Sequence, residues 1–326
     1  MKQDAGPPIT PRAAIGNVDH PAGYAYGIAA YGLWGLIPIY FRQLRTVPPL
    51  EMLAHRAAWA LATLAIIIVF ARRGPAVVAA LRNRRTVVTL LGSAALIAVN
   101  WLTYIYSVAT EQVFQAALGY FITPLANMAL GMFVLGERMR PLQWAALVPA
   151  IVGVVAMTVQ AGQLPWIALV LAVSFSLYGL LRKLAAADAL VGLFTETMFL
   201  TPIALAYLGF LASANRSTFG GDDSTMTWLL ALSGPVTTGP LLCFAAAARN
   251  LRMTTLGFLQ FLAPMLQALV AVFLFREPFK REYQIALPLI GVAVLLYIAD
   301  AVRTNRRRLR DASIREAETQ PALEDL

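Results

Sequence analysis

The sequence predicts an all-α integral membrane protein with ten transmembrane helices arranged as two inverted five-helix repeats. Three observations lead to this fold class. Of the 326 residues, 59% are hydrophobic and only 13% are charged, whereas about 25% of residues are charged in a typical soluble domain. The chain contains ten apolar runs, each roughly long enough to cross a bilayer. Similar motifs recur 140 positions apart in the two halves of the chain.

The apolar runs are joined mostly by short links, and each is expected to form one spanning helix. In the first half they are Tyr24–Phe41, Leu50–Phe70, Thr86–Val108, Val113–Leu135 and Leu142–Val159. In the second half they are Pro165–Leu181, Ala189–Leu211, Trp228–Ala248, Leu256–Phe275 and Tyr283–Val302. We therefore expect a disordered cytoplasmic tail (1–23), a first repeat (24–160), a second repeat (165–302) and a basic cytoplasmic tail (303–326).

The distribution of basic residues predicts the orientation. Residues 1–23 are rich in Pro, Gly and Ala and lack an apolar core, which is unlike a signal peptide. With the N-terminus in the cytoplasm, most of the 26 lysines and arginines fall on the cytoplasmic side, as the positive-inside rule requires. The exceptions outside are Arg42, Arg45, Arg216, Arg276, Lys280 and Arg281. Because these charges form short clusters without a recognition motif, the net charge of +9 does not indicate a nucleic-acid partner.

The run Leu118–Pro141 has features beyond those of an anchor. A small and polar residue recurs at every fourth position, which places one polar face along the helix; these residues are Gln115, Gly119, Thr123, Asn127 and Gly131. Pro124 frees a backbone carbonyl within the span. The same pattern returns later, because Phe121, Pro124 and Glu137 are matched by Phe261, Pro264 and Glu277. We interpret Pro124 and Pro264 as paired hinges.

Further matches support the repeat. The segment Leu33-Trp34-Gly35 resembles Leu177-Tyr178-Gly179, and Tyr104 lies 140 positions before Phe244. Because each repeat has five helices, an odd number, the second repeat enters the membrane from the opposite side. Inverted repeats are a physical route to alternating access, although duplicated units can also be purely structural.

Ionisable groups within the spans are few, because a charge at the bilayer centre is costly. Glu196 is the carboxylate that lies clearly within a predicted helix, and Arg56 is the corresponding basic residue, with His55 preceding it. One interpretation is that Glu196 exchanges protons while Arg56 or His55 binds a polar or anionic substrate group. The alternative is that Glu196 pairs permanently with a basic residue near the cytoplasmic rim and Arg56 extends towards Glu51 or water.

Other polar and aromatic side chains in the spans suit the binding of a small amphipathic solute. Asn100 and Tyr104 share one helix face, one turn apart, and need polar partners in lipid. An interhelical hydrogen bond is an equally common role for such groups. The complete set of predicted substrate-binding residues is Trp34, His55, Arg56, Asn100, Tyr104, Tyr120, Asn127, Tyr178 and Gln260.

Several strings of residues resemble the RarD group of the EamA family, within the drug/metabolite transporter superfamily. They include HRAAW at 55–59, NWLTYIYSV at 100–108, GYFITPLANMALGMFVLGER at 119–138 and LLCFAAAARNLRMTTLGFLQF at 241–261. The resemblance implies ten helices, two inverted repeats, an inner-membrane location and export of small molecules, with a loose association with chloramphenicol. The turn Arg276-Glu277-Pro278 departs from the Gly-Glu that many relatives carry there.

Other classes of protein are less compatible with the sequence. An intramembrane enzyme would need a recognisable motif, and HExxH, GxSxG and CxxC are absent from the sequence. We expect no catalytic residues, cofactor or metal site, and the single Cys243 allows no disulfide within the chain. A channel or a helical scaffold stays open as an alternative to a carrier. The expected partners are a small-molecule substrate and the lipid bilayer, and a homodimer is left open.

Overall fold

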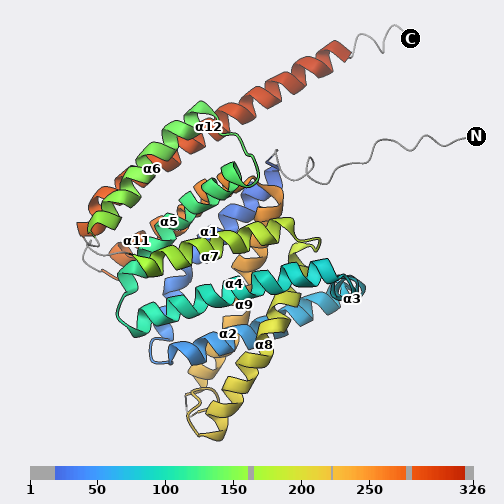
Figure 1. The fold of residues 1–326 in the computed structure, drawn as a ribbon, viewed down its shortest axis with the longest axis vertical. Coiled ribbons are helices and arrows are strands. Elements are labelled where there is room, and N and C mark those ends of the chain that lie inside the picture. The colour runs from blue at the N-terminus through green and yellow to red at the C-terminus, as the bar shows by residue number, and fades with distance from the viewer. Residues whose placement is uncertain (1–18, 161–164, 222, 277–280, 320–326) are drawn as a thin grey trace, which may run out of the picture. The chain divides into compact units, whose positions relative to one another are not determined.

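The computed structural model describes residues 19–160, 165–221, 223–276 and 281–319, and every regular element within these ranges is a helix (Figure 1). The chain forms two compact units. The smaller consists of α6 (Pro141–Gln160) and α12 (Arg281–Thr319), and the larger contains the remaining elements. In the larger unit these are α1 (Pro21–Gln43), α2 (Pro49–Phe70), α3 (Gly74–Arg82), α4 (Arg84–Ala109), α5 (Val113–Phe133), α7 (Trp166–Leu184), α8 (Ala189–Ser213), α9 (Ser224–Asn250), α10 (Met253–Gln260), α11 (Leu262–Leu269) and the π-helix η1 (Val270–Leu274).

Local sequence explains where several helices begin. The side chain of Asn83 accepts a hydrogen bond of 3.1 Å from the backbone N–H of Thr86 at the start of α4. Asp188 accepts from Val191 N–H (2.9 Å) at the start of α8, and Asp223 caps α9 in the same way. Such caps satisfy N–H groups that have no partner within their own helix.

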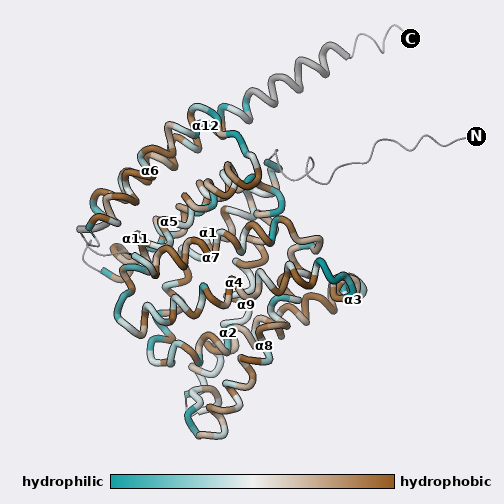
Figure 2. Tube along the Cα trace, viewed as in Figure 1, coloured by the Kyte–Doolittle hydropathy of each residue, from teal (hydrophilic) through white to brown (hydrophobic). Residues whose placement is uncertain are grey.

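Nine helical stretches in the described part of the chain are long and apolar enough to cross a membrane (Figure 2). Each of the ten predicted runs overlaps helix, so the all-helical membrane fold is confirmed at this level. The first run, α1, is 23 residues long but is not among the nine, because its glycines and tyrosines lower its hydropathy. A tenth crossing therefore stays a prediction.

The two predicted hinge prolines lie in different local structures. The run around Pro264 is interrupted, since α10 ends at Gln260 and α11 begins at Leu262. A proline four residues after Gln260 cannot donate to the Gln260 carbonyl, and its ring crowds that oxygen. Pro124, in contrast, lies inside the continuous helix α5. The two prolines are thus not equivalent bends in this conformation.

Helix pairing in the larger unit follows a regular scheme. Helix α1 packs against α9 and α11, while α7 packs against α4 and α5. Helix α2 packs against α8 and α9, α4 also packs against α8, and α5 packs against α10. At the last crossing, a Cβ on Gly257 would lie only 2.6 Å from the carbonyl oxygen of Pro124. The close approach of α5 and α10 therefore requires glycine, as is common between membrane helices.

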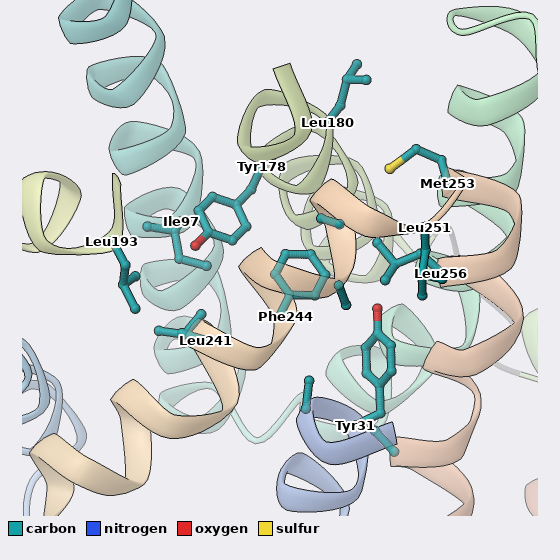
Figure 3. Packing of buried hydrophobic residues seen from close by; sticks show 14 of the residues in the cluster. Tyr31, Ile97, Tyr178, Leu180, Leu193, Leu241, Phe244, Leu251, Met253 and Leu256 are labelled. Atoms are coloured by element: carbon teal, nitrogen blue, oxygen red, sulfur yellow. The ribbon is translucent and has the colours of Figure 1, made fainter. Parts of the chain in front are cut away.

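Three aromatic rings form the centre of the main core of the larger unit. Phe244 of α9 stacks on Tyr178 of α7, with ring centroids 5.8 Å apart and planes inclined by 13°. Tyr31 of α1 meets the same ring edge-on at 6.3 Å. Figure 3 shows Phe244 between the two tyrosines. The core therefore joins one helix from the first half of the chain to two from the second.

The smaller unit is a pair of packed helices, α6 and α12. A Cβ on Gly153 would lie 3.2 Å from the Ala286 carbonyl oxygen, so the two backbones approach closely. The guanidinium of Arg140 donates from Nε to Asp300 Oδ2 at 2.7 Å, which links the two helices near the start of α6. Close backbone contact and an ion pair thus hold this unit together.

The structure differs from the sequence-based expectation at three places. The short helix α3 falls in a segment for which no helix was expected. Helix α12 continues to Thr319, through most of the expected basic tail. Order also begins before residue 24, because Asp19 is buried and α1 starts at Pro21. The rest of the expected N-terminal tail (1–18), residues 320–326, and the pair Glu277 and Pro278 lie outside the described residues.

Candidate functional site

The larger unit encloses a cavity of about 300 Å³, which is at the lower end of the range for small-molecule sites. Its lining includes Phe41 near the end of α1, Arg56 in the second turn of α2, Tyr104 near the end of α4, and Tyr120 two turns into α5. Helix α1 is followed directly by α2, and α4 by α5. Phe41 and Arg56 therefore lie on either side of one helix junction, and Tyr104 and Tyr120 on either side of another. The cavity therefore occupies the half of the unit that contains these helix junctions.

Arg56 is the charged side chain in the lining of this cavity. Its Nε donates a hydrogen bond of 3.1 Å to Thr237 Oγ1 of α9. The guanidinium carbon lies 5.0 Å from the ring centroid of Trp101 and 5.3 Å from that of Phe41, within range of cation–π attraction. In the described part of the chain, Arg56 forms no ion pair with a carboxylate.

Amide side chains in the cavity wall are held by neighbouring helices. Asn100 of α4 donates from Nδ2 to the Leu171 carbonyl (2.9 Å) and to Ser174 Oγ (3.0 Å), both on α7. Gln267 of α11 donates to the Trp34 carbonyl of α1 at 3.0 Å, and Gln260 accepts from Asn127 Nδ2. Because these contacts fix the amides, the polar part of the wall is largely preformed.

Aromatic rings supply most of the remaining surface. Trp34 meets Phe175 edge-on, with centroids 5.6 Å apart, and Tyr104 lies 6.3 Å from Tyr120. A solute in the cavity would therefore contact flat apolar surfaces together with one guanidinium and several neutral amides.

A second buried polar group surrounds Glu196 of α8. Its carboxylate accepts hydrogen bonds from Ser93 Oγ of α4, from Tyr178 OH (3.4 Å) and from Arg182 Nη1 (3.2 Å). Arg182 is fully buried and also donates to the Ala189 carbonyl at 3.0 Å. Arg182, rather than Arg56, is thus the basic partner of Glu196, which matches the ion-pair alternative left open by the sequence.

Glu196 lies beside the main cavity rather than in it. A space of about 10 Å³ adjoins Glu196 and Tyr178 and shares Ile97, Trp101 and Thr237 with the lining of the cavity. That volume is roughly enough for the centre of one water molecule. The carboxylate is therefore separated from the cavity by a thin wall of side chains.

The opposite end of the larger unit is closed by charged groups around the start of α10. Asp19 accepts hydrogen bonds from Arg252 N–H (2.8 Å), Arg252 Nε (3.1 Å) and Thr255 Oγ1 (2.9 Å). Glu137 accepts from the backbone N–H groups of Met253 (2.7 Å) and Thr254 (2.8 Å). Both carboxylates are buried. They satisfy and neutralise the positive N-terminus of α10.

Charged groups also link the ends of α7, α8 and α9 that are predicted to lie on the cytoplasmic side. Lys183 donates to the Ala248 carbonyl at 3.2 Å, and Arg249 donates to the Ala185 carbonyl at 2.9 Å.

Burial raises the pKa of Asp188, but the hydrogen bond from Val191 N–H and the charge of Arg73 outweigh this effect and lower the pKa below its ordinary value. The Asp188 carboxylate therefore stays ionised at neutral pH, and its pairing with Arg73 is lost only as pH falls through the lowered pKa.

The structure brings together seven of the predicted binding and hinge residues. Those that line the cavity are Trp34, Arg56, Asn100, Tyr104, Tyr120, Gln260 and Pro264. Asn127 contacts the cavity only through Gln260, and Tyr178 lies beside Glu196. Pro124 is buried and is not part of the lining.

His55 is placed differently from the expectation that it approaches the central cavity. Its ring lies 5.1 Å from that of Phe219, and its Nε2 is 3.9 Å from Glu51 Oε1. It faces a separate surface hollow near the link between α8 and α9. Consecutive residues on a helix point about 100° apart, and α2 is turned so that Arg56 lines the cavity while His55 borders the separate hollow.

Several lining residues were missed, and some carried a usable signal. Gln260, Pro264 and Gln267 recur at i, i+4 and i+7, so the face that carries the first two also carries the third. Trp101, Phe41 and Phe175 are aromatic residues among many, and nothing in their spacing separates cavity from core. Arg182 could have been found as the partner of Glu196, because the two lie on consecutive helices joined by a short link.

The fold and the cavity together define a class: a polytopic helical membrane protein with an internal site of solute size. Residues 21–159 match the model of the EamA-like transporter family. An uncharacterized transporter of Pseudomonas aeruginosa is 44% identical over 287 residues, which is 87% of this chain and 96% of that relative. Protein RarD of Escherichia coli is 40% identical over 285 residues, again 87% of this chain and 96% of the relative.

A more distant relative is the chloramphenicol-sensitive protein RarD of Pseudomonas aeruginosa, 30% identical over 293 residues (88% of this chain, 97% of the relative). A solved crystal structure shares the fold with a TM-score of 0.66 at 20% identity, covering 87% of this chain and 98% of that one. This chain belongs to the EamA-like transporter family. The resemblance inferred from its motifs is confirmed, and one of these relatives is named a transporter.

The buried pair of Arg182 and Glu196 gives a prediction for stability. Arg182→Met removes the cation and leaves a buried carboxylate without its partner, which costs about 3–5 kcal/mol in the free energy of unfolding. Arg73→Met, at an exposed ion pair, should cost at most about 1 kcal/mol. Unfolding of the purified protein in detergent measures both. The double variant Arg182→Met/Glu196→Met should recover much of the loss, and a double variant no more stable than Arg182→Met would contradict the pairing.

Proposed function

We propose that this protein is a secondary active transporter that exports a small solute across the inner membrane by alternating access. The observation that carries the proposal is the cavity, which lies in one half of the larger unit while buried charged groups close the other end. A site reachable from one side at a time is what alternating access requires. Membership of a transporter family supports the same conclusion.

Ten transmembrane helices in two inverted repeats are part of this proposal, with α1 as the crossing beyond the nine apolar spans. The helix contacts support it, because the main contacts that the first helix of one repeat makes with the other repeat are matched by those of the first helix of the second repeat. The first helix of each repeat packs against the third and fourth helices of the other, as α1 does with α9 and α11 and α7 does with α4 and α5. The fifth helices, α6 and α12, pack against each other.

The proposed orientation places both termini, and the charged closed end, in the cytoplasm, so that the cavity faces outward. The distribution of basic residues motivates this orientation. A reporter fused after Val302 should be cytoplasmic, and one inserted at Gly220 in the link between α8 and α9 should be external. Both reporters on the same side would exclude the ten-crossing topology.

Transport itself is tested by solute counterflow in proteoliposomes, using a panel of amino acids, purines, organic acids and amphenicol drugs. The amphenicols are included because of the name of one relative. A carrier exchanges labelled for unlabelled solute and saturates, a channel gives downhill flux without exchange, and a scaffold gives neither.

Pro124→Ala and Pro264→Ala should insert normally but slow exchange. Each proline leaves one carbonyl without its helical hydrogen bond, that of Tyr120 or that of Gln260, and both of these residues line the cavity. Exchange at the parental rate in both variants would remove the hinge role.

Coupling to protons through Glu196 is the finer proposal. Glu196 is a buried carboxylate separated by a thin wall from the cavity, and its partner Arg182 would be released or re-paired if Glu196 took a proton. Glu196→Gln keeps the shape while removing titration, so exchange should persist while accumulation driven by an imposed pH gradient is lost. Glu51→Gln is the matched control, because Glu51 is equally buried but contacts Thr218 of the α8–α9 link. Undiminished accumulation by Glu196→Gln would assign Glu196 a purely structural role.

A further inference from the structure

We infer that the cavity binds an amphipathic monocarboxylate: the carboxylate of the solute pairs with Arg56, and its apolar or aromatic body lies against the aromatic walls. This inference names a substrate class for the proposed transport site and so rests on the proposed function for its biological meaning. The argument depends on the charge balance of the cavity, on the free donors of Arg56 and on the chemistry of the remaining wall.

The charge balance distinguishes Arg56, which is partly buried, from the fully buried Arg182. Arg182 is neutralised by Glu196 at 3.2 Å. Arg56 has a hydroxyl and two aromatic faces as neighbours, and no carboxylate of the described residues lies within ion-pairing distance of it. A cation that is partly removed from water without a counter-charge loses hydration, whereas an anion bound beside it restores neutrality. A single carboxylate supplies the one negative charge that Arg56 lacks.

The geometry of Arg56 leaves donors for that carboxylate. Its Nε is occupied by Thr237 Oγ1, which fixes the guanidinium plane between Trp101 and Phe41. Within the described structure, Nη1 and Nη2 donate no hydrogen bond to the protein, and Arg56 lines the cavity. Both groups can therefore donate to a solute. A planar guanidinium presents such a pair of donors to a carboxylate in bidentate form.

The other walls argue against a positive charge on the solute. The lining contains no aspartate or glutamate, and Glu196, which borders the small adjoining space, is already engaged by Arg182. The aromatic faces of Trp101 and Phe41 are used by Arg56 itself. An ammonium group would therefore lose its hydration near a like charge without a compensating anion. An amine or a zwitterion should bind more weakly than the corresponding acid.

The apolar part of the solute is set by the rest of the wall. Trp34, Phe175, Tyr104 and Tyr120 provide ring faces and edges that suit an aromatic or branched body. A cavity of about 300 Å³ admits a small molecule rather than a peptide or a lipid. A dianion such as a phosphate monoester would leave one negative charge uncompensated in a site with one cation.

The inference is tested by direct binding to the purified protein at neutral pH, with four probes that share one phenyl body. They are 3-phenylpropanoate, its neutral amide, L-phenylalanine as the zwitterion, and phenethylamine as the cation. Quenching of the intrinsic tryptophan fluorescence or calorimetry reports the affinity. We expect 3-phenylpropanoate to bind at least about tenfold more tightly than each of the other three. Charge-assisted hydrogen bonds are roughly twice as strong as neutral ones, and the difference in free energy corresponds to about a tenfold change in affinity.

Variants identify Arg56 as the origin of this preference. In Arg56→Gln the acid should bind no more tightly than its amide, and in Arg56→Lys, which keeps the charge but not the planar donors, the preference should be reduced several-fold. Arg42→Gln is the matched control: Arg42 is exposed, stacks on Phe275 near the same end of the unit, and is not part of the lining. It should keep the parental preference.

The outcomes separate this inference from the proposed transport function. A parent protein that binds the acid no better than the amide overturns the inference, and so does an Arg56→Gln variant that stays folded and keeps the preference. If Arg56→Gln does not fold, the ranking of the four probes in the parent and in Arg56→Lys still decides. Selective binding without counterflow of 3-phenylpropanoate would uphold the inference and count against transport, whereas counterflow of a cation or a neutral solute alone would do the reverse.

Discussion

The start of α10 is held by two buried carboxylates that come from distant parts of the chain. Asp19 precedes α1 and Glu137 follows α5, yet both accept hydrogen bonds from the first N–H groups of α10 or from Arg252 beside them. The first N–H groups of α10 have no partner within the helix. Without these acceptors they would be buried and unsatisfied, at a cost of about 1–3 kcal/mol each. The contact ties α1 and α5 to the end of α9, and it closes this end of the larger unit. The cavity is lined by residues near the opposite helix junctions.

Arg182 and Arg56 show how similar residues can differ in their surroundings. Arg182 is fully buried, hydrogen-bonds to a backbone carbonyl and pairs with Glu196, so its charge is balanced within the protein although its Nε has no hydrogen-bond partner. Arg56 is held by Thr237 and by aromatic faces, which orient the guanidinium without cancelling its charge. The anion that we infer to bind at Arg56 would supply the negative charge that the described protein residues do not.

Pro124 and Pro264 have unequal surroundings in this conformation. Pro124 sits in a continuous helix, and its carbonyl is covered by Gly257. Pro264 follows a break at Phe261, and the helix beyond it changes to a π-helix at Val270. The close approach of Gly257 to the Pro124 carbonyl is possible because glycine has no side chain.

The sequence by itself determined the helical membrane fold and the approximate bounds of the long apolar helices, because hydropathy is a local property of consecutive residues. It also identified most of the polar groups of the cavity, since polar side chains in apolar runs are few. It could not decide which way each group faces. A helix with weak amphipathicity can rotate about its axis at little cost until its neighbours fix it, and only tertiary packing turned Arg56 into the cavity and His55 towards Phe219. In the same way, the choice of Arg182 over Arg56 as the partner of Glu196 depends on which helices touch, and that is decided by close packing across the whole unit.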